Sequence, residues 1–247
     1  MIEDVGQLLR EMYREYANSV ELSADAIYHN GTPLRPVVPL DCGTGRLFIL
    51  GAYPSTRFMT VGETTDVPSS DNMAPFESER WYDGTRIRHQ PSARELQDCF
   101  LTPLGIDRNS CWITDLVKVF LFKPGHVDRY TKISAVPPSG YIRKNFYKLG
   151  QMSLPWIRRE IKIAQPRLVL TLGAEVAGVL HGVRDSSRQV ALLRPEVATI
   201  EVGGLPVKVI HCAHPGILMR RGPSNPWPDR HWEKFIPEIK RFLDNGV

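Results

Sequence analysis

The sequence predicts an α/β protein, a three-layer α/β/α sandwich in which helices cover both faces of a central, mostly parallel, four-stranded sheet. Two observations predict this class. Short apolar runs alternate along the 247 residues with amphipathic, helix-like segments, and such alternation is typical of parallel sheets whose strands are connected by helices. The apolar runs are also continuous, as expected for strands that are buried on both faces. We expect a single domain over residues 1–247, with a helix and an extension in residues 1–45.

Four apolar runs are predicted as the strands of this sheet: 46–50, 111–119, 167–172 and 206–212. Residues 197–202 are expected to pair with the last of them, because Gly203 and Gly204 between the two segments are typical of a hairpin turn. The strands are therefore expected to alternate with helices until the hairpin closes the sheet.

Helical spacing or helix-start signals mark five segments: 2–20, 92–103, 154–165, 174–182 and 229–244. Ser92 is the expected N-cap of the second helix, with Glu95 at the capping-box position. Pro155 is expected in the first turn of the third, where its missing N–H costs nothing. The polar stretches 59–90 and 121–150 are predicted to be long irregular excursions, and loops of that length are often functional.

The composition favours a soluble protein of the cytoplasm. Hydrophobic residues make up 42% of the chain and charged residues 23%, which is ordinary for a globular domain. No apolar run approaches the ~20 residues of a membrane-spanning helix. The N-terminal MIEDVGQLLREM is acidic and amphipathic, which is not the pattern of a signal peptide. We expect a cytoplasmic monomer without a membrane partner.

The cysteines do not indicate a metal site. Cys42, Cys99, Cys111 and Cys212 contain no C-x-x-C pair and are irregularly spaced, so neither a zinc ribbon nor a disulfide framework is indicated. We expect buried, reduced thiols, no bound metal and no cofactor.

The charge is distributed unevenly. The net charge is only +4, yet residues 116–167 hold eleven Lys or Arg against two acidic residues. Two interpretations are open: an ordinary solvated surface, or a face that binds a polyanion, since phosphates are held by clustered cations.

Unusual residues follow the predicted strands. The first strand leads into Gly51-Ala52-Tyr53-Pro54-Ser55, the second contains Asp115, the third ends at Gly173, and the fourth leads into Cys212-Ala213-His214-Pro215-Gly216. Ligands of open parallel sheets bind beyond the carboxyl ends of the strands. Each feature alone has an ordinary explanation, such as a tight turn or a surface histidine. Together, beside the basic segment, they predict a functional site at this edge.

Taken in order, these residues resemble a known family. GAYPS follows the first strand, ITDLVK lies in the second, LVLTLGAEVA spans the third, and HPGILMRR follows the last. With the connecting runs LTPLGIDRNSCWITDLVK and SLPWIRREIKIAQPRLVLTLGAEVAGVL, the set is similar to the uracil-DNA glycosylase superfamily, and the spacing most resembles its thermophile-type, family-four branch. The resemblance covers about residues 46–244.

The resemblance implies a monofunctional DNA glycosylase of base excision repair. Such an enzyme flips a damaged base, uracil or another deaminated or modified base, out of DNA and hydrolyses its N-glycosidic bond. Flipping is needed because the glycosidic carbon is inaccessible in a stacked duplex. DNA is the implied partner. Two alternatives are a catalytically weak or inactive DNA- or nucleotide-binding protein of the same fold, and a hydrolase or transferase that acts on a free nucleoside or nucleotide.

The resemblance also implies roles for single residues. His214 is the candidate catalytic donor to the departing base, whose developing charge a donor would stabilise. The implied base pocket consists of Gly51, Ala52, Tyr53, Pro54, Phe76 and Asp115, with Phe76 stacking on the flipped base. The implied DNA-binding residues are Ser55, Pro215, Gly216, Leu218, Met219, Arg220 and Arg221. Leu218 and Met219 would wedge into the DNA, whereas the arginines and the backbone amides near Ser55 and Gly216 would hold phosphates.

The first motif departs from the family pattern. Many members carry an acid or an amide there that positions the attacking water, but this chain has Ala52 and Tyr53, neither of which can act as a general base. Glu63, Asp66 and Asp71 in the following stretch are candidate substitutes.

Two further departures concern Asp115 and the iron–sulfur cysteines of the family-four branch. Asp115 stands where the family usually has a base-reading Asn. An ionised Asp only accepts hydrogen bonds and suits an exocyclic amine or a ring N–H, whereas a protonated Asp could still read uracil. Val119 and Ser153 stand at or near positions of the family-four iron–sulfur cysteines, so we expect no cluster.

Overall fold

The computed structural model describes residues 4–245, and its centre is a sheet of five strands in the order β6-β1-β7-β9-β8. The strands are β1 (Leu47–Gly51), β6 (Cys111–Asp115), β7 (Leu168–Leu172), β8 (Ala198–Val202) and β9 (Leu205–Cys212). The first four in spatial order are parallel, and β8 pairs antiparallel with β9 at one edge. The α/β class with a mostly parallel sheet is thus confirmed, and the fifth strand is the other arm of the expected hairpin.

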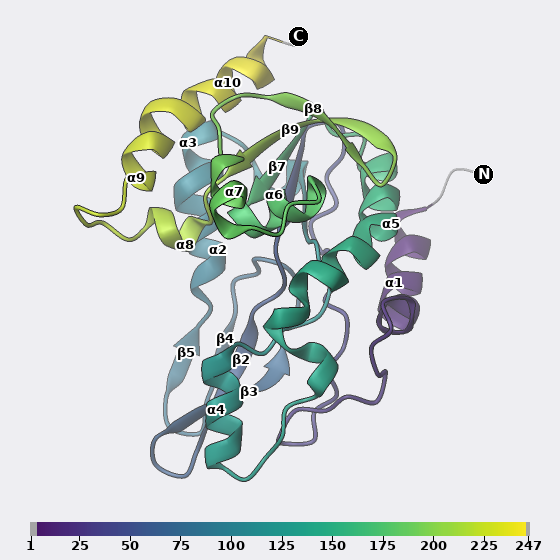
Figure 1. Cartoon of the computed structure of the whole chain (residues 1–247), viewed down its shortest axis with the longest axis vertical. Coiled ribbons are helices and arrows are strands. Elements are labelled where there is room, and N and C mark those ends of the chain that lie inside the picture. Colours follow the sequence, from purple (N-terminus) through teal and green to yellow (C-terminus); the bar gives the residue numbers. More distant parts are fainter. Residues whose placement is uncertain (1–3, 246–247) are drawn as a thin grey trace.

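Helices cover both faces of the sheet (Figure 1). Side chains of β1 alternate between two cores: Phe48 and Leu50 pack in one, and Leu47 and Ile49 in the other. The first core lies under α1 (Val5–Ser19), α5 (Phe146–Ala164) and α6 (Ala174–Leu180); the second lies under α2 (Pro91–Leu96), α3 (Thr102–Leu104) and α10 (Ile236–Asp244). This arrangement confirms the three-layer sandwich.

The remaining helical elements are short. They are α4 (Pro124–Lys132), α7 (Ser186–Ala191), α8 (Pro215–Leu218) and α9 (Trp227–Arg230), the π-helical turns Gln97–Leu101 and His231–Phe235, and the 3-10 turns Arg108–Ser110, Ser139–Tyr141 and Arg143–Asn145. The predicted helix over 2–20 corresponds to α1, but its first residues lie outside the described part of the chain.

Two predicted helix starts were wrong. The N-cap of α2 is Gln90, with Pro91 in the first turn, and Ser92 makes no capping hydrogen bond. The helix predicted over 154–165 begins eight residues earlier, at Phe146, so Pro155 lies inside α5. Gly150 and Ser153 lie within α5 because of tertiary contacts. A Cβ at Gly150 would stand 3.0 Å from Val179, and the buried Ser153 hydroxyl hydrogen-bonds to the Tyr16 hydroxyl.

The polar stretch predicted as an irregular excursion is largely two antiparallel hairpins. They are β2 (Thr56–Val61) with β3 (Thr65–Asp71), and β4 (Arg80–Tyr82) with β5 (Ile87–His89). Together with α4 they lie at the end of the molecule away from β8 and α10 (Figure 1). The second stretch, 121–150, contains α4, two 3-10 turns and the start of α5.

The N-terminal segment contributes to the main core. Leu8, Met12 and Tyr16 of α1 are fully buried. The Tyr16 hydroxyl lies 2.6 Å from Ser153 Oγ and accepts a hydrogen bond from the Lys118 backbone N–H at 3.0 Å. The segment therefore packs directly against α5 and the chain that follows β6.

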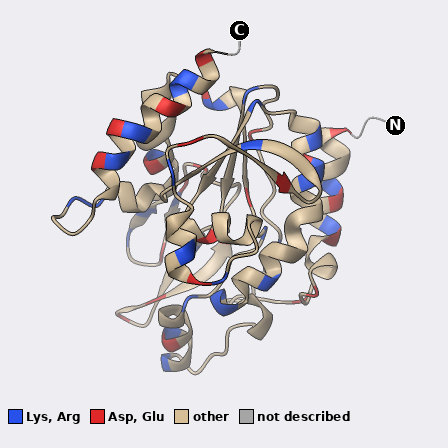
Figure 2. Ribbon diagram, turned by 45° about the horizontal axis from the view of Figure 1, so that its top comes forward, with Lys and Arg blue, Asp and Glu red and all other residues tan. Residues whose placement is uncertain are grey.

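Several cations of the basic segment are paired with acidic residues. Lys118 is buried and paired with Glu160, while Lys148 and Arg159 pair with Glu21 and Glu11 near the N-terminus. Lysine, arginine and acidic residues are interspersed along α1, α5 and α10 (Figure 2). These cations are therefore not free to bind a polyanion, and the interpretation as a polyanion-binding face stays a prediction for the rest of the segment.

Two further observations concern the described residues. No helix between residues 4 and 245 is long and apolar enough to cross a membrane. The cysteines are free: Cys99, Cys111 and Cys212 are buried, and Cys42 is half-buried.

Candidate active site

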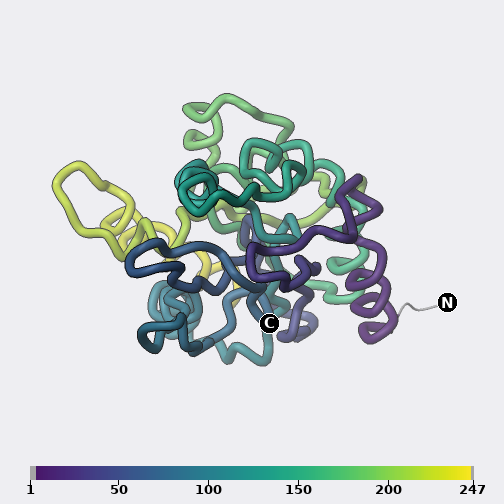
Figure 3. Tube along the Cα trace, turned by 90° about the horizontal axis from the view of Figure 1, so that it is seen from below, coloured from purple at the N-terminus to yellow at the C-terminus, as the bar shows by residue number. Residues whose placement is uncertain are grey.

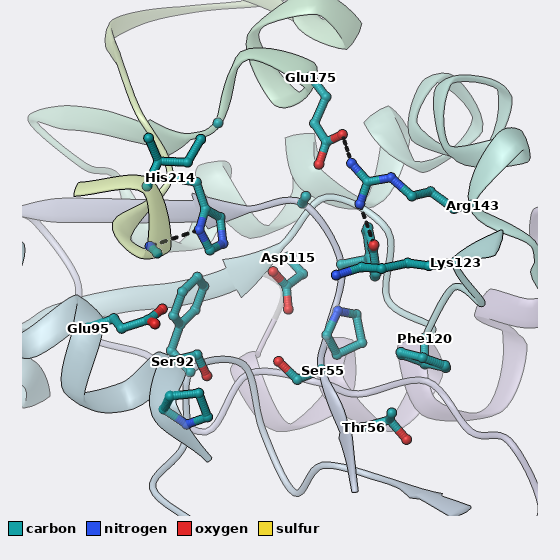
Figure 4. Close-up of a pocket in the computed structure, with 18 of the residues that line it drawn as sticks. Ser55, Thr56, Ser92, Glu95, Asp115, Phe120, Lys123, Arg143, Glu175 and His214 are labelled. Carbon is teal, nitrogen blue, oxygen red and sulfur yellow. Dashed lines mark hydrogen bonds and ion pairs between the residues drawn. The ribbon is translucent and has the colours of Figure 1, made fainter. Parts of the chain in front are cut away.

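A cleft of about 710 Å³ opens at the carboxyl ends of the parallel strands, where the sequence predicts a site. Its lining comes from the turn after β1 (Ala52 to Thr56), the end of β6 (Asp115), the start of α6, and the segment after β9 (His214, Gly216, Ile217, Arg220). Residues of α2 and of the hairpin region complete the walls (Figure 4). Four segments that are distant in sequence thus meet at one sheet edge.

Two side chains of the cleft lining, Asp115 and Phe76, lie directly over Gly51. A Cβ at Gly51 would stand 2.1 Å from Asp115 Oδ1 and 2.7 Å from Phe76 Cε2. Phe76 has a backbone φ of 55°, a left-handed conformation that is uncommon for a bulky residue and strained by roughly 1–3 kcal/mol. This strained turn holds the ring beside the carboxyl group.

The Asp115 carboxyl is buried and has no hydrogen-bond partner among residues 4–245. Only 2% of the residue is exposed, and burial raises the pKa of its side chain to about 7, although the Lys118 charge opposes the shift. The Lys118 side chain binds other groups. Its Nζ donates a hydrogen bond of 2.7 Å to the Asp115 backbone carbonyl oxygen and forms an ion pair with Glu160. The carboxyl therefore faces the cleft (Figure 4) with both of its oxygens available.

His214 is held in one tautomer. Its Nδ1 accepts a hydrogen bond of 3.1 Å from the Gly216 backbone N–H, so a neutral ring carries its proton on Nε2. Burial, together with the charges of Lys123, Arg143 and Arg220, lowers the pKa of His214 to about 4. At neutral pH the side chain is thus an uncharged N–H donor at the wall of the cleft.

Tyr53 is tied to a cationic cluster on the opposite wall. Arg143 donates to the Tyr53 hydroxyl and to the Glu175 carboxylate (Figure 4), and burial raises the pKa of Tyr53. Lys123 also lines this wall, and burial together with the Arg143 charge lowers its pKa. This side of the cleft is suited to an anion.

Most of the predicted site residues line this cleft: Ala52, Tyr53, Pro54, Ser55, Phe76, Asp115, His214, Gly216 and Arg220. Gly51 lies directly beneath two of them. Pro215 is buried in the first turn of α8.

Leu218 does not suit the expected wedge role, because it is 5% exposed and packs in the core beneath α8. Its neighbours Ile217 and Met219 are the exposed apolar side chains of this segment. Met219 and Arg221 line a second, smaller hollow, together with Leu218. The connection from α8 to α9, residues 219–226, projects from the body of the molecule (Figure 3).

The candidate substitutes for the missing acid are not in the cleft lining. Glu63 lies in the exposed β2–β3 turn, Asp66 pairs with Arg88, and Asp71 bonds to Tyr28. The acidic residues that line the cleft, apart from Asp115, are Glu95 and Glu175.

Sequence reasoning did not assign several lining residues to the site: Glu95, Lys123, Arg143, Glu175 and Ile217. Glu95 resembled part of a helix cap, and the two cations were visible only as members of the basic segment. Ile217 directly follows the His214-Pro215-Gly216 motif, and this position could have indicated that it lines the site. In the described residues, no group of three or more His, Cys, Asp and Glu side chains could hold a metal ion.

A sequence model of the uracil DNA glycosylase superfamily matches residues 45–238, the part of the chain that contains the sheet and the whole lining of the cleft. The chain belongs to the uracil DNA glycosylase superfamily. No curated protein matches it significantly. The membership indicates a DNA glycosylase-like function, a hydrolase whose substrate is DNA. It does not distinguish between the branches of this superfamily.

Proposed function

We propose that the protein is a monofunctional DNA glycosylase of base excision repair, which flips a damaged base into the cleft and hydrolyses its N-glycosidic bond. The observation that carries the proposal is the pairing, in one cleft, of a neutral His214 with an unpartnered, buried Asp115. A base in the cleft could lie with its face against the Phe76 ring and its edge toward the Asp115 carboxyl, because these two side chains meet over Gly51.

The chemistry fits a departing base. Negative charge develops on the base as the bond to the sugar breaks, and a fixed N–H donor aimed at a base oxygen stabilises that charge. His214 is suited to this role because the Gly216 N–H fixes its tautomer before substrate arrives. The exposed Ile217 and Met219 would fill the space that the flipped nucleotide leaves, in place of the buried Leu218.

Phosphate contacts would come from cations that are free of acidic partners. Arg220 and Lys123 line the cleft and form no ion pair among the described residues, and Arg221 is exposed on the projecting connection. The backbone amides near Ser55 would supply further contacts. Because the cleft lining itself holds few unpaired cations, we expect the cleft to contact a small number of phosphates.

Asp115 would select the base by its protonation state. Its raised pKa of about 7 lets both forms exist near neutrality. The protonated carboxyl both donates and accepts, which suits the N–H and carbonyl edge of uracil; the ionised carboxyl only accepts, which suits an exocyclic amine. We therefore expect the preference among bases to change across neutral pH.

The test is base release from labelled oligonucleotides that contain uracil, hypoxanthine, xanthine or an oxidised pyrimidine, in single strands and duplexes. The expected result is a free base and an abasic site that alkali cleaves, with no covalent adduct trapped by borohydride. A borohydride adduct would contradict monofunctional chemistry, and a panel left uncut by pure protein would contradict the enzyme.

A second candidate is a DNA- or nucleotide-binding protein without catalysis. The observation that favours it is the turn after β1, where Ala52 has no polar side chain and the Tyr53 hydroxyl is occupied by Arg143. It predicts salt-sensitive DNA binding without base release. The same panel, read for binding as well as for cleavage, separates the two candidates.

A further inference from the structure

Hydrolysis of a glycosidic bond needs a water molecule at the sugar carbon, and a carboxylate that accepts its proton accelerates the step. The turn after β1 contains no such group, and Asp66 and Asp71 are engaged elsewhere. Asp115 lines the cleft directly over Gly51. Because Asp115 is assigned to the edge of the base, a separate water-activating carboxylate would come from another element.

Glu95 of α2 is such a carboxylate. It lines the cleft, yet no hydrogen bond or ion pair to its side chain exists among residues 4–245. Its Oε2 and the Nδ1 of His214 each lie 3.3 Å from the point where a Cβ on Gly216 would stand. Figure 4 shows Glu95 on the same side of the cleft as His214. Glycine at position 216 keeps the space between the two groups open.

The other cleft acid, Glu175, is placed differently. It is held through its Oε2 by Arg143 on the wall opposite Glu95 (Figure 4), so its negative charge is already paired. With Asp115 assigned to the base edge, Glu95 is the remaining unpaired carboxylate of the cleft lining, and it lies beside the proposed donor.

We propose that Glu95 is a catalytic residue that orients the attacking water and accepts its proton, replacing the acid that the first motif lacks. This inference rests on the proposed glycosylase function. The water oxygen bonds to the glycosidic carbon as the carbon–nitrogen bond breaks. The electron pair of the broken bond leaves with the base, where the His214 Nε2–H stabilises it. The water proton moves to Glu95.

The surroundings of Glu95 suit a base. Burial raises the pKa of its carboxyl, and the positive charge of Arg220 limits the increase. The other titratable or charged groups near it are His214 beyond Gly216, buried Cys99, and the exposed Arg94–Asp98 pair on its own helical segment. Since the proposed step needs the ionised form, activity should fall at acidic pH as Glu95 takes up a proton.

The experiment compares Glu95→Gln with the wild-type protein in single-turnover cleavage, using the oligonucleotide of the panel that the wild type cleaves fastest. Asp98→Asn is the matched control: it makes the same carboxylate-to-amide change one turn further along, outside the cleft lining. Glu95→Gln is expected to lower the cleavage rate by about 10²- to 10⁴-fold, with unchanged DNA affinity and unfolding midpoint. The acid limb of the pH–rate profile should disappear, and formate should partly restore Glu95→Ala.

Each outcome decides the inference. If the wild type cleaves and Glu95→Gln stays within twofold of Asp98→Asn, Glu95 is not the base, although the proposed function stands. A loss of rate matched by a loss of DNA affinity or folding, without formate rescue, also overturns the inference. If the wild type cleaves nothing on the panel, the proposed function itself fails.

Discussion

His214 is neutral because of its position, and this neutrality can be measured. Three cations and burial act against a second proton, while the Gly216 N–H occupies Nδ1. Nitrogen-detected NMR of the folded protein should find the Nε2–H tautomer at neutral pH, with protonation only near pH 4. Titration near the ordinary value of about 6.5, or an Nδ1–H tautomer, would remove the basis for a neutral donor.

Asp115 should make stability depend on pH. Burial raises the pKa of its carboxyl in the folded state from 3.8 to about 7, so the folded protein holds this proton more tightly than the unfolded chain. The contribution is favourable below the unfolded pKa and is lost as the pH rises toward the folded pKa.

Asp115→Asn lacks this ionisation. The free energy of unfolding of the variant, relative to the wild type, should therefore increase between about pH 5 and about pH 8 in urea denaturation. A difference that is the same at both pH values would mean that the carboxyl is not perturbed.

The turn after β1 depends on a glycine that has no side chain to clash. In Gly51→Ala the new methyl group would collide with Asp115 Oδ1 and the Phe76 ring. We expect a loss of about 1–3 kcal/mol in the free energy of unfolding and loss of base release. Gly125→Ala in α4 is the control, because a Cβ there meets nothing within 4 Å and alanine favours helix by at most about 1 kcal/mol. Equal stability of the two variants would contradict the close packing over Gly51.

A buried ion pair joins Lys118, which follows β6, to Glu160 of α5. Lys118 and Glu160 are both fully buried, and Glu160 also accepts a hydrogen bond of 2.8 Å from Trp112 Nε1. Lys118→Met leaves an uncompensated buried carboxylate and should cost about 3–5 kcal/mol of unfolding free energy. The double variant with Glu160→Gln should regain most of it. Urea denaturation checks both, and a double variant no better than the single one would contradict the pairing.

Strands were easier to predict from the sequence than helix ends. Continuous apolar runs identify a strand buried on both faces without knowledge of its neighbours. The start of α5 depends on tertiary contacts, because Gly150 and Ser153 look like helix breakers until Val179 and Tyr16 are placed against them. The first turn of α2 could have been predicted from Pro91, since proline is favoured there.

The site was predictable where motifs follow strands and not where distant elements meet. GAYPS and HPG mark the ends of β1 and β9, and their residues line the cleft. Glu95 and Arg143 reach the same cleft from α2 and from the turn before α5. No local sequence pattern indicates that these two elements meet there. The burial of Leu218 was not foreseen, because sequence alone does not tell which side of a short helix faces the core.

Binding of DNA by the whole molecule should use few cations. Arg220 is unpaired in the cleft lining, whereas Lys148 is paired with Glu21 far along the chain. Arg220→Ala should weaken DNA binding and reduce the slope of log affinity against log salt by about 1. Lys148→Ala, a charge change of the same size within the basic segment, should leave the slope unchanged. Equal effects of both variants would indicate a diffuse basic surface instead of a defined cleft.

The central claim is that this cleft releases a base by means of a neutral histidine. The most direct measurement is single-turnover base release at neutral pH, with free base identified by mass spectrometry, for the wild type and for His214→Ala. The account predicts release of a damaged base by the wild type and a rate about 10²-fold lower for His214→Ala, with DNA binding retained. Equal rates for the two proteins, or no base released by the wild type from any DNA that it binds, would contradict the account.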